Sequence, residues 1–242
     1  MKKYFSLLLF LISILSCDVA TLSKEEASKI NNYRINIQIY DHFEEKLNRI
    51  TVSLSNGKKQ IIDKDIKILV NNKPLYFFLK QELYYTKKSY YYLDTLKRKE
   101  SYYFEIILRD STKHPIAFIK PSDNKLMEFN IPKTVSKNEN IILKWENLKA
   151  PYALEIQKGI QVKNKVAKNI TEYGYSKTKF DTIKSKKGNY KIDKSYYEDS
   201  LTIATRVEFN LSRKEIGLIN PLFKKNSNLT YNFSLNKSVE IK

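Results

Sequence analysis

Apolar and polar positions alternate along much of the chain from residue 33 onward. In YRINIQIY (33–40) the three isoleucines fall on one parity and polar residues on the other, and RITVSLS (49–55) repeats the pattern. Successive side chains of a β-strand point to opposite faces, so this alternation predicts half-buried strands. The dipeptide Asn56-Gly57 follows directly. It is typical of a tight hairpin turn.

The same pattern recurs through both halves of the chain, and no stretch between Tyr33 and Lys120 carries a long apolar stripe of helical period. Further strands are predicted in DIKILV, PLYFFL, SYYFEIILRD, HPIAFIK, IILKWEN, YALEIQ, LTIATRVEFNLS, NLTYNFSL and VEIK, with a turn at Asn71-Asn72-Lys73-Pro74. Strands spaced by about 8 to 12 residues are typical of a sandwich. The sequence therefore predicts an all-β fold.

The polar segment KPSDNK (120–125) predicts a turn between domains. We expect two consecutive antiparallel β-sandwich domains, at 33–121 and 122–242. Within the second, residues 161–200 are polar and weakly patterned. Their most basic window, KSKKGNYKIDKSYY, predicts either a solvated hairpin or an anion-binding loop lined by Lys184, Lys186, Lys187, Lys191 and Lys194.

Trp145 ends a predicted strand, and a polar turn and the strand YALEIQ follow it. A tryptophan in that position predicts a core residue rather than a ligand platform. The arrangement resembles immunoglobulin and fibronectin type III sandwiches, in which a tryptophan on an early strand fills the core. The resemblance covers only this short region. It implies sandwich domains of that type.

The first residues predict export. Lys2 and Lys3 precede an unbroken apolar run from Phe5 to Leu15, which is too short to be a permanent membrane span. Ser16-Cys17 then resembles the lipobox of bacterial lipoproteins, in which a diacylglyceryl group on the cysteine anchors the protein. We therefore expect a signal peptide at 1–16 and a lipid-anchored tether at 17–32. The alternative is a non-lipidated secretory peptide that happens to end on a cysteine.

The whole plan resembles Bacteroidota cell-envelope lipoproteins with tandem immunoglobulin-like domains. That resemblance implies an exported, membrane-anchored protein, with the outer membrane as the expected location. Asp18 after the cysteine is compatible with inner-membrane retention in some bacteria, so the membrane and the side it faces stay open. Cys17 is the single cysteine, and the exported part therefore has no intramolecular disulfide.

The net charge of +18 suggests anionic partners. The lysines are spread among Asn, Ile and Tyr, however, and a codon bias explains that distribution better than an anionic partner does. The chain holds 18 tyrosines, many of them adjacent, so that one ring of each pair is expected to face outward. We expect ligand contacts at Tyr91, Tyr103, Lys186 and Lys187. Nucleic acid is not an expected partner, because an exported protein seldom meets it.

No residue set predicts catalysis or a cofactor. His42 and His114 are the only two histidines, and neither has the spacing of a helical zinc site. His42 next to acidic residues fits a turn between strands or a weak cation site. There is no G-x-S-x-G motif. The carboxylate pairs Asp63 with Asp65 and Glu198 with Asp199 are candidates only by default. We expect no enzyme and no metal or cofactor site.

One short pattern recurs: aspartate, then serine or threonine, then an aliphatic residue or threonine. It resembles the acceptor motif for O-glycosylation in exported Bacteroidota proteins, and the candidate acceptors are Thr95, Ser111, Thr182 and Ser200. Attached sugars would mark these positions as surface. The alternative is ordinary turn chemistry, which favours the same residues.

These observations favour one function. We expect a lipid-anchored, non-catalytic binding or structural module of the cell envelope, with a protein of the envelope or a secreted protein as its partner. Strand edges and loops would make the contact. The alternative is a glycan-binding surface lipoprotein that uses exposed tyrosines and lysines.

Overall fold

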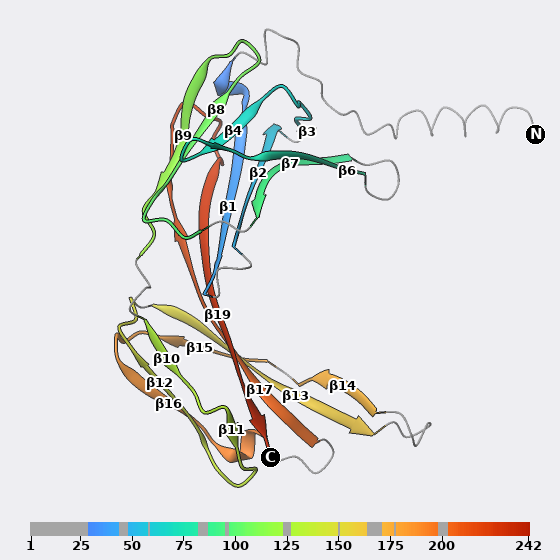
Figure 1. Ribbon diagram of the computed structural model, residues 1–242, viewed down its shortest axis with the longest axis vertical. Helices are drawn as coiled ribbons and strands as arrows, with labels where there is room; N and C mark the ends of the chain where they lie inside the picture. Colours follow the sequence, from blue (N-terminus) through green and yellow to red (C-terminus); the bar gives the residue numbers. More distant parts are fainter. Residues whose placement is uncertain are drawn as a thin grey trace, which may run out of the picture. The chain divides into compact units, whose positions relative to one another are not determined.

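The computed structural model describes residues 29–43, 48–57, 59–81, 87–94, 97–122, 127–149, 151–163, 171–176, 178–197 and 203–242. In these ranges the chain is almost entirely β-strand (Figure 1), with two single-turn 3₁₀ helices, η1 (Ile30–Asn32) and η3 (Lys194–Tyr196). The prediction of an all-β fold is confirmed. The signal peptide, Cys17 and most of the tether lie outside the described residues.

The chain forms two compact units, and each takes residues from several parts of the sequence. Unit 1 comprises Met1–Ile39, Arg49–Ile119 and Ile216–Thr230, and unit 2 comprises Tyr40–Asn48, Lys120–Glu215 and Tyr231–Lys242. Three strands therefore have residues in both units: β1 (Arg34–His42), β17 (Ile203–Ile216) and β19 (Asn228–Ile241). The division into domains at 33–121 and 122–242 stays a prediction.

Unit 1 contains two groups of hydrogen-bonded strands. The first runs in the order β1-β2-β7-β6, with β3 on β2, and the second in the order β18-β9-β8-β4-β5. The bounds of these strands are β2 (Arg49–Asn56), β3 (Lys59–Gln60), β4 (Lys67–Val70), β5 (Lys73–Pro74), β6 (Tyr76–Gln81), β7 (Lys87–Asp94), β8 (Tyr102–Ile107), β9 (Lys113–Ile119) and β18 (Leu218–Ile219).

In unit 1, the alternation of apolar and polar residues in the sequence matches the alternation of buried and more exposed side chains along β1 and β2. Ile35 and Ile37 are fully buried, and Ile50, Val52 and Leu54 on β2 are at most 2% exposed. Burying one aliphatic side chain of this size stabilises the fold by about 1.5–3 kcal/mol relative to leaving it in water. The apolar face of these strands is therefore the core.

Two predicted turns are confirmed. Asn56 and Lys59 are cross-strand partners around Gly57, whose φ of +65° is easily adopted by glycine. Val70 and Lys73 are partners across Asn71 and Asn72, which have φ values of 47° and 65°. Positive φ at both central residues is the geometry of a type I′ hairpin, for which asparagine is favoured.

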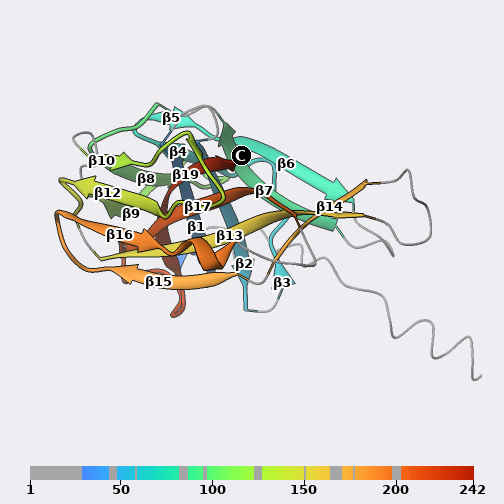
Figure 2. The ribbon, with the colours of Figure 1, turned by 90° about the horizontal axis from the view of Figure 1, so that it is seen from below.

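Unit 2 also has two groups of strands, which form two layers (Figure 2). One runs β14-β13-β17-β19, with β15 on β13 and β11 on β19, and the other runs β10-β12-β16. The β11–β19 pairing is parallel. The pairings β10–β12, β12–β16, β13–β14, β13–β15 and β13–β17 are antiparallel. The remaining bounds are β10 (Glu128–Asn130), β11 (Thr134–Val135), β12 (Ile141–Glu146), β13 (Tyr152–Lys163), β14 (Thr171–Tyr175), β15 (Lys179–Ile183) and β16 (Gly188–Ile192).

Trp145 lies in the core of unit 2, as predicted. Its side chain is 6% exposed, and Nε1 donates a hydrogen bond to the carbonyl oxygen of Ser185 at 3.2 Å. Gly188 is its cross-strand partner on β16, and a Cβ there would lie only 2.7 Å from the indole ring. Glycine at 188 therefore leaves the space that the ring occupies.

Residues 161–200 differ from the prediction. They contain β14, β15 and β16, and the basic window does not form a hairpin, because β15 pairs with β13 while β16 pairs with β12. Four of the five residues of β15 are exposed, so this edge strand shows no apolar alternation in the sequence. The two predicted C-terminal strands are one strand, β19, which continues through Lys237 with the same parity of burial.

Candidate binding surfaces

Four aromatic rings lie together on one face of the β6–β7 hairpin. Tyr76 and Phe78 are the cross-strand partners of Tyr92 and Tyr90, with ring centroids 5.9 and 5.2 Å apart. We call Tyr76, Phe78, Tyr90 and Tyr92 the aromatic ladder. Tyr76 is 63% exposed and Phe78 39%. The ladder therefore presents apolar area to solvent at β6, the last strand in its sheet.

A second surface lies on the outward face of β13 and β17 in unit 2. Cross-strand partners share a face of the sheet, and β13 pairs Glu155 with Asn210 and Gln157 with Glu208. On its other side β13 pairs with β14, whose Tyr173 and Tyr175 have the same parity. We call this set the β13–β17 face: Glu155, Gln157, Tyr173, Tyr175, Glu208 and Asn210.

Two adjoining hollows cover this face. Glu155, Gln157 and Asn210 line one of about 400 Å³, to which Asn236, Lys237 and Ser238 of β19 also contribute. Tyr173, Tyr175 and Arg206 line the other, of about 620 Å³. Both volumes fall in the range typical of small-molecule sites.

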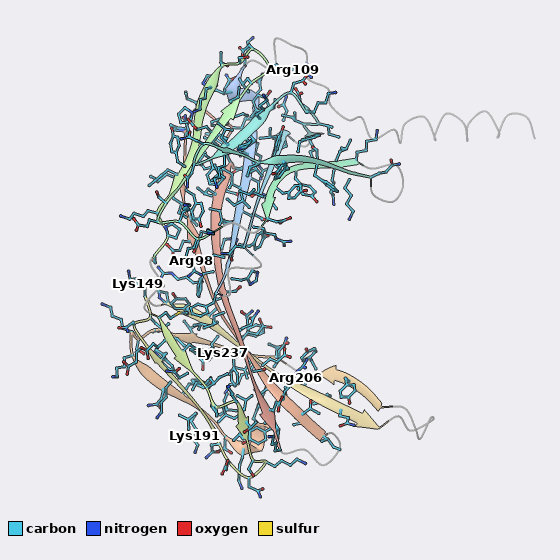
Figure 3. All side chains as sticks on the ribbon, in the orientation of Figure 1. Arg98, Arg109, Lys149, Lys191, Arg206 and Lys237 are labelled. Carbon is cyan, nitrogen blue, oxygen red and sulfur yellow. The ribbon has the colours of Figure 1, made fainter. Side chains whose placement is uncertain are left out.

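A network of charge and hydrogen bonds fixes Tyr175 on this face. Arg206, labelled in Figure 3, donates from Nη2 to the Tyr175 hydroxyl at 2.7 Å and makes an ion pair through Nε with Glu208 at 2.6 Å. The Tyr175 hydroxyl donates to Glu208 at 3.1 Å. The hydrogen bond that Arg206 donates to Tyr175 and the charge of Glu208 raise the pKa of Arg206, so its guanidinium stays protonated.

The basic window is partly neutralised by its own neighbours. Lys187 makes an ion pair with Glu146 at 2.6 Å, and this contact raises the pKa of the Lys187 amine. Lys191 lies 3.7 Å from the Asp193 carboxylate. The Lys186 side chain is exposed, and its carbonyl accepts a hydrogen bond from the Leu148 amide. These contacts reduce the charge available to an anionic ligand.

The two predicted tyrosine contacts differ in exposure. Tyr103 is 41% exposed beside the buried Tyr102, as the alternation predicts. Tyr91 instead faces the core: its ring is 3% exposed, and its hydroxyl donates to the carbonyl oxygen of Asp63. A ligand could reach Tyr91 only by opening the core, so the outward rings of this strand are Tyr90 and Tyr92.

Asp63 is buried and part of a network of hydrogen bonds and charge. Its carboxylate is 2.6 Å from Arg109 Nε, and it also accepts a hydrogen bond from the Asp65 amide at 3.0 Å. Each oxygen therefore has a partner. The hydrogen bond and the charge of Asp63 raise the pKa of Arg109. Glu198 and Asp199, the other default carboxylate pair, lie outside the described residues.

Tyr33 lies close to this network and gives a test of it at high pH. Its side chain is fully buried, and burial together with the charge of Asp63 raises its pKa from 10.0 to about 12. The folded state thus holds the phenol proton more tightly than the unfolded state does. Stability is therefore unaffected below about pH 10 and falls as the pH rises towards 12.

We expect Tyr33→Phe to lose less stability between pH 10 and pH 12 than the unsubstituted protein, by about 2 kcal/mol, because a shift of one pKa unit corresponds to about 1.4 kcal/mol and the Tyr33 phenol is only half ionised at pH 12. Urea unfolding at several pH values measures this. Some decline will remain, because burial and Asp63 also raise the pKa of Tyr91. The exposed Tyr103→Phe is the control; equal declines in both variants would contradict the assignment.

The histidines have structural partners. His42 Nδ1 lies 2.7 Å from the Ser234 hydroxyl, and its amide donates to Asn48. His114, before Pro115, lies on β9 with its ring beside Thr112. Among the described residues no group of three or more His, Cys, Asp or Glu side chains is arranged to hold a metal ion. Within the same residues, no helix is long and apolar enough to cross a bilayer.

The candidate glycan acceptors fall in different settings. Ser111 is exposed at a turn with φ of 66°, where Asp110 accepts hydrogen bonds from the amide and hydroxyl of Thr112. These bonds lower the pKa of Asp110. Thr182 is exposed on the edge strand β15 and not in a turn. Thr95, Ser200 and the lipidation candidate Cys17 lie outside the described residues.

Comparison with models of known protein families finds no match to this chain, and comparison with curated proteins finds none. The functional argument therefore rests on the surfaces themselves. Of these, the sequence had indicated the tyrosine cluster of β7 but not the β13–β17 face. Its residues are brought together by strand pairing, and only the alternating tyrosines of TEYGY (171–175) gave a signal in the sequence.

Proposed function

We propose that this protein is a lipid-anchored component of the bacterial cell envelope, and that it acts as a non-catalytic binding or structural module for an envelope or secreted protein. The anchor is Cys17, and the outer membrane is the proposed location. The basic start, the apolar run and the lipobox-like Ser16-Cys17 support that address. The two units are proposed to be sandwiches of immunoglobulin or fibronectin type III kind, which the buried Trp145 of unit 2 supports.

The observation that carries the proposed binding function is the aromatic ladder at an edge strand. Soluble proteins usually protect an edge strand with charges, prolines or bulges, because its unpaired backbone groups invite another strand. Here β6 instead exposes Tyr76, Phe78 and Leu79, the last at 45%. A partner strand added to β6 would gain backbone hydrogen bonds and would cover the ladder. Aromatic residues are also enriched where proteins bind each other.

Crosslinking from β6 tests this proposal. We expect a photoreactive benzoyl-phenylalanine in place of Phe78 to link the membrane-anchored protein in its own cells to one recurrent protein, identified by mass spectrometry. The matched control is the same residue at Tyr103, which has similar exposure, 41% against 39%, but lies on β8 between β4 and β9. It should yield no recurrent partner.

A surface variant adds a quantitative arm. Tyr76→Ala removes a ring that is mostly exposed, so the fold should be retained while recovery of the crosslinked partner falls about tenfold, as expected for an aromatic anchor residue. Identical background proteins from positions 78 and 103, or unchanged recovery with Tyr76→Ala, would count against docking at the ladder.

The alternative is glycan binding through Tyr103, Lys186 and Lys187. Less in the structure supports it at those residues: Lys187 is paired with Glu146, Tyr91 is buried, and Tyr103 lies in unit 1 while both lysines lie in unit 2. The protein-docking function is therefore the one that the geometry supports best.

A further inference from the structure

We propose that the β13–β17 face of unit 2 is a binding site for an uncharged oligosaccharide. The proposal uses residues that do not belong to the aromatic ladder. It is independent of docking at β6, so either can fail without the other. Its evidence is the ring geometry, the hydrogen-bonding groups and the charge balance of this face.

The two tyrosines supply a stacking surface. Tyr173 is 75% exposed and Tyr175 is 53% exposed, and their positions two residues apart on β14 place both on one face of the strand. The C–H face of a pyranose ring is apolar and packs on an aromatic ring. The hydrogen bonds that Tyr175 accepts from Arg206 and donates to Glu208 orient its ring before a ligand arrives, which lowers the entropy lost on binding.

A glycine allows this orientation. Gly159 is the cross-strand partner of both Tyr175 and Arg206, and a Cβ at this position would lie 2.8 Å from Cγ of Arg206. Without a side chain at 159, Arg206 can extend across β13 to the tyrosine ring, where its guanidinium lies 5.7 Å from the centroid. Glycine at 159 thus leaves the space that the Arg206 side chain occupies.

Beside the rings, the face offers both donors and acceptors, as a sugar hydroxyl requires. Gln157 and Asn210 donate to the Glu155 carboxylate at 3.0 and 3.3 Å, which holds three side chains in fixed positions along the smaller hollow. The Oδ1 atom of Asn210 is buried and accepts no hydrogen bond from the described residues. Leaving such an acceptor unpaired costs free energy, whereas the amide and carboxylate groups of Gln157 and Glu155 in the hollow are the donors and acceptors within reach of a sugar hydroxyl.

The charge of the face favours an uncharged ligand. Although the chain carries +18 overall, the Arg206 charge here is balanced by Glu208 at 2.6 Å, and Lys237 donates to the carbonyl oxygen of Phe129 at 2.6 Å. Glu155 adds a negative charge, and its carboxylate accepts hydrogen bonds from the uncharged amides of Gln157 and Asn210. The face therefore offers no excess of positive charge to a phosphate or an acidic glycan, and a neutral sugar needs none.

Binding of defined oligosaccharides tests the proposal. The full-length protein, purified in a detergent without a sugar headgroup, is titrated with neutral hexasaccharides: β-1,4-glucan, β-1,3-glucan, α-1,4-glucan, mannan, β-1,4-xylan and chitin oligomers. We expect at least one to bind. Tyr173→Ala should weaken it about tenfold through the lost stacking, and Gln157→Ala about fivefold through a lost hydrogen bond.

Two controls separate binding from folding and from charge. Tyr103→Ala removes an exposed ring from unit 1 and should leave the Kd unchanged, and circular dichroism checks that each variant is folded. Polygalacturonate is the anionic probe and should bind more weakly than the neutral sugar. The proposal is overturned if no neutral hexasaccharide binds, if Tyr173→Ala and Gln157→Ala leave binding intact, or if the anionic probe binds more tightly.

Discussion

Replacing Cys17 by alanine is expected to release the protein from the membrane fraction. Alanine has no thiol to accept a diacylglyceryl group, and the apolar run before it is too short to serve as a permanent span. Each buried CH₂ of an acyl chain contributes about 0.8 kcal/mol, so the loss of two chains changes an effectively permanent attachment into none. The expected effect is nearly all-or-none.

Fractionation of cells, with partition into a detergent phase, measures this change. Ser16→Ala is the matched control, because it keeps a small residue before an intact Cys17, and it should remain in the membrane. The intact mass of the native protein should carry the lipid, and sugars on Thr95, Ser111, Thr182 or Ser200 would appear in the same spectrum. A native mass without lipid would favour a non-lipidated secretory peptide, and a Cys17→Ala protein that stays in the membrane would contradict anchoring through Cys17.

Trp145→Ala is expected to cause the largest loss of stability among the single substitutions considered. Removal of a buried indole costs about 3–5 kcal/mol, and total stabilities of single domains are about 5–15 kcal/mol. Two further features place this position at the upper end. The Ser185 carbonyl would lose its 3.2 Å donor, and Gly188 has no side chain to fill the cavity.

Urea unfolding followed by far-UV circular dichroism measures the loss, because Trp145 is the only tryptophan and its fluorescence disappears with it. Trp145→Phe should lose roughly half as much, since a phenyl ring refills part of the space but makes no hydrogen bond. Ile142→Ala, at a 38% exposed position on the same strand, should cost less than about 1 kcal/mol. Equal midpoints for Trp145→Ala and Ile142→Ala would place Trp145 outside the core.

The sequence was sufficient for strands that have one buried face. The isoleucines of β1 and the turn residues Asn56-Gly57 and Asn71-Asn72 each act through local geometry, so their prediction needed no knowledge of the partner strand. It was insufficient for β14, β15 and β16. These strands are held by hydrogen bonds to β12 and β13, and exposed side chains such as Phe180 on β15 give no apolar period.

Surfaces were harder to predict than strands. The tyrosine pairs indicated an outward ring, but which of two neighbours faces outward depends on register, and a shift of one residue exchanges them. Tyr103 is 41% exposed, whereas Tyr91 is 3% exposed. The β13–β17 face combines positions near 155, 174 and 208, which only strand pairing brings together. No linear motif could have joined them.

Unit 1 is made of separate segments of the chain, and this affects when it can fold during synthesis. Its residues Ile216–Thr230 follow the whole of Lys120–Glu215, which belongs to unit 2. Chains emerge from the ribosome or the export channel from the N-terminus, and a domain can finish folding only when its last segment has emerged. Unit 1 can therefore complete its fold only after Lys120–Glu215 has emerged. A chaperone that shields emerging strands would act on this protein late in its synthesis and not after its first half.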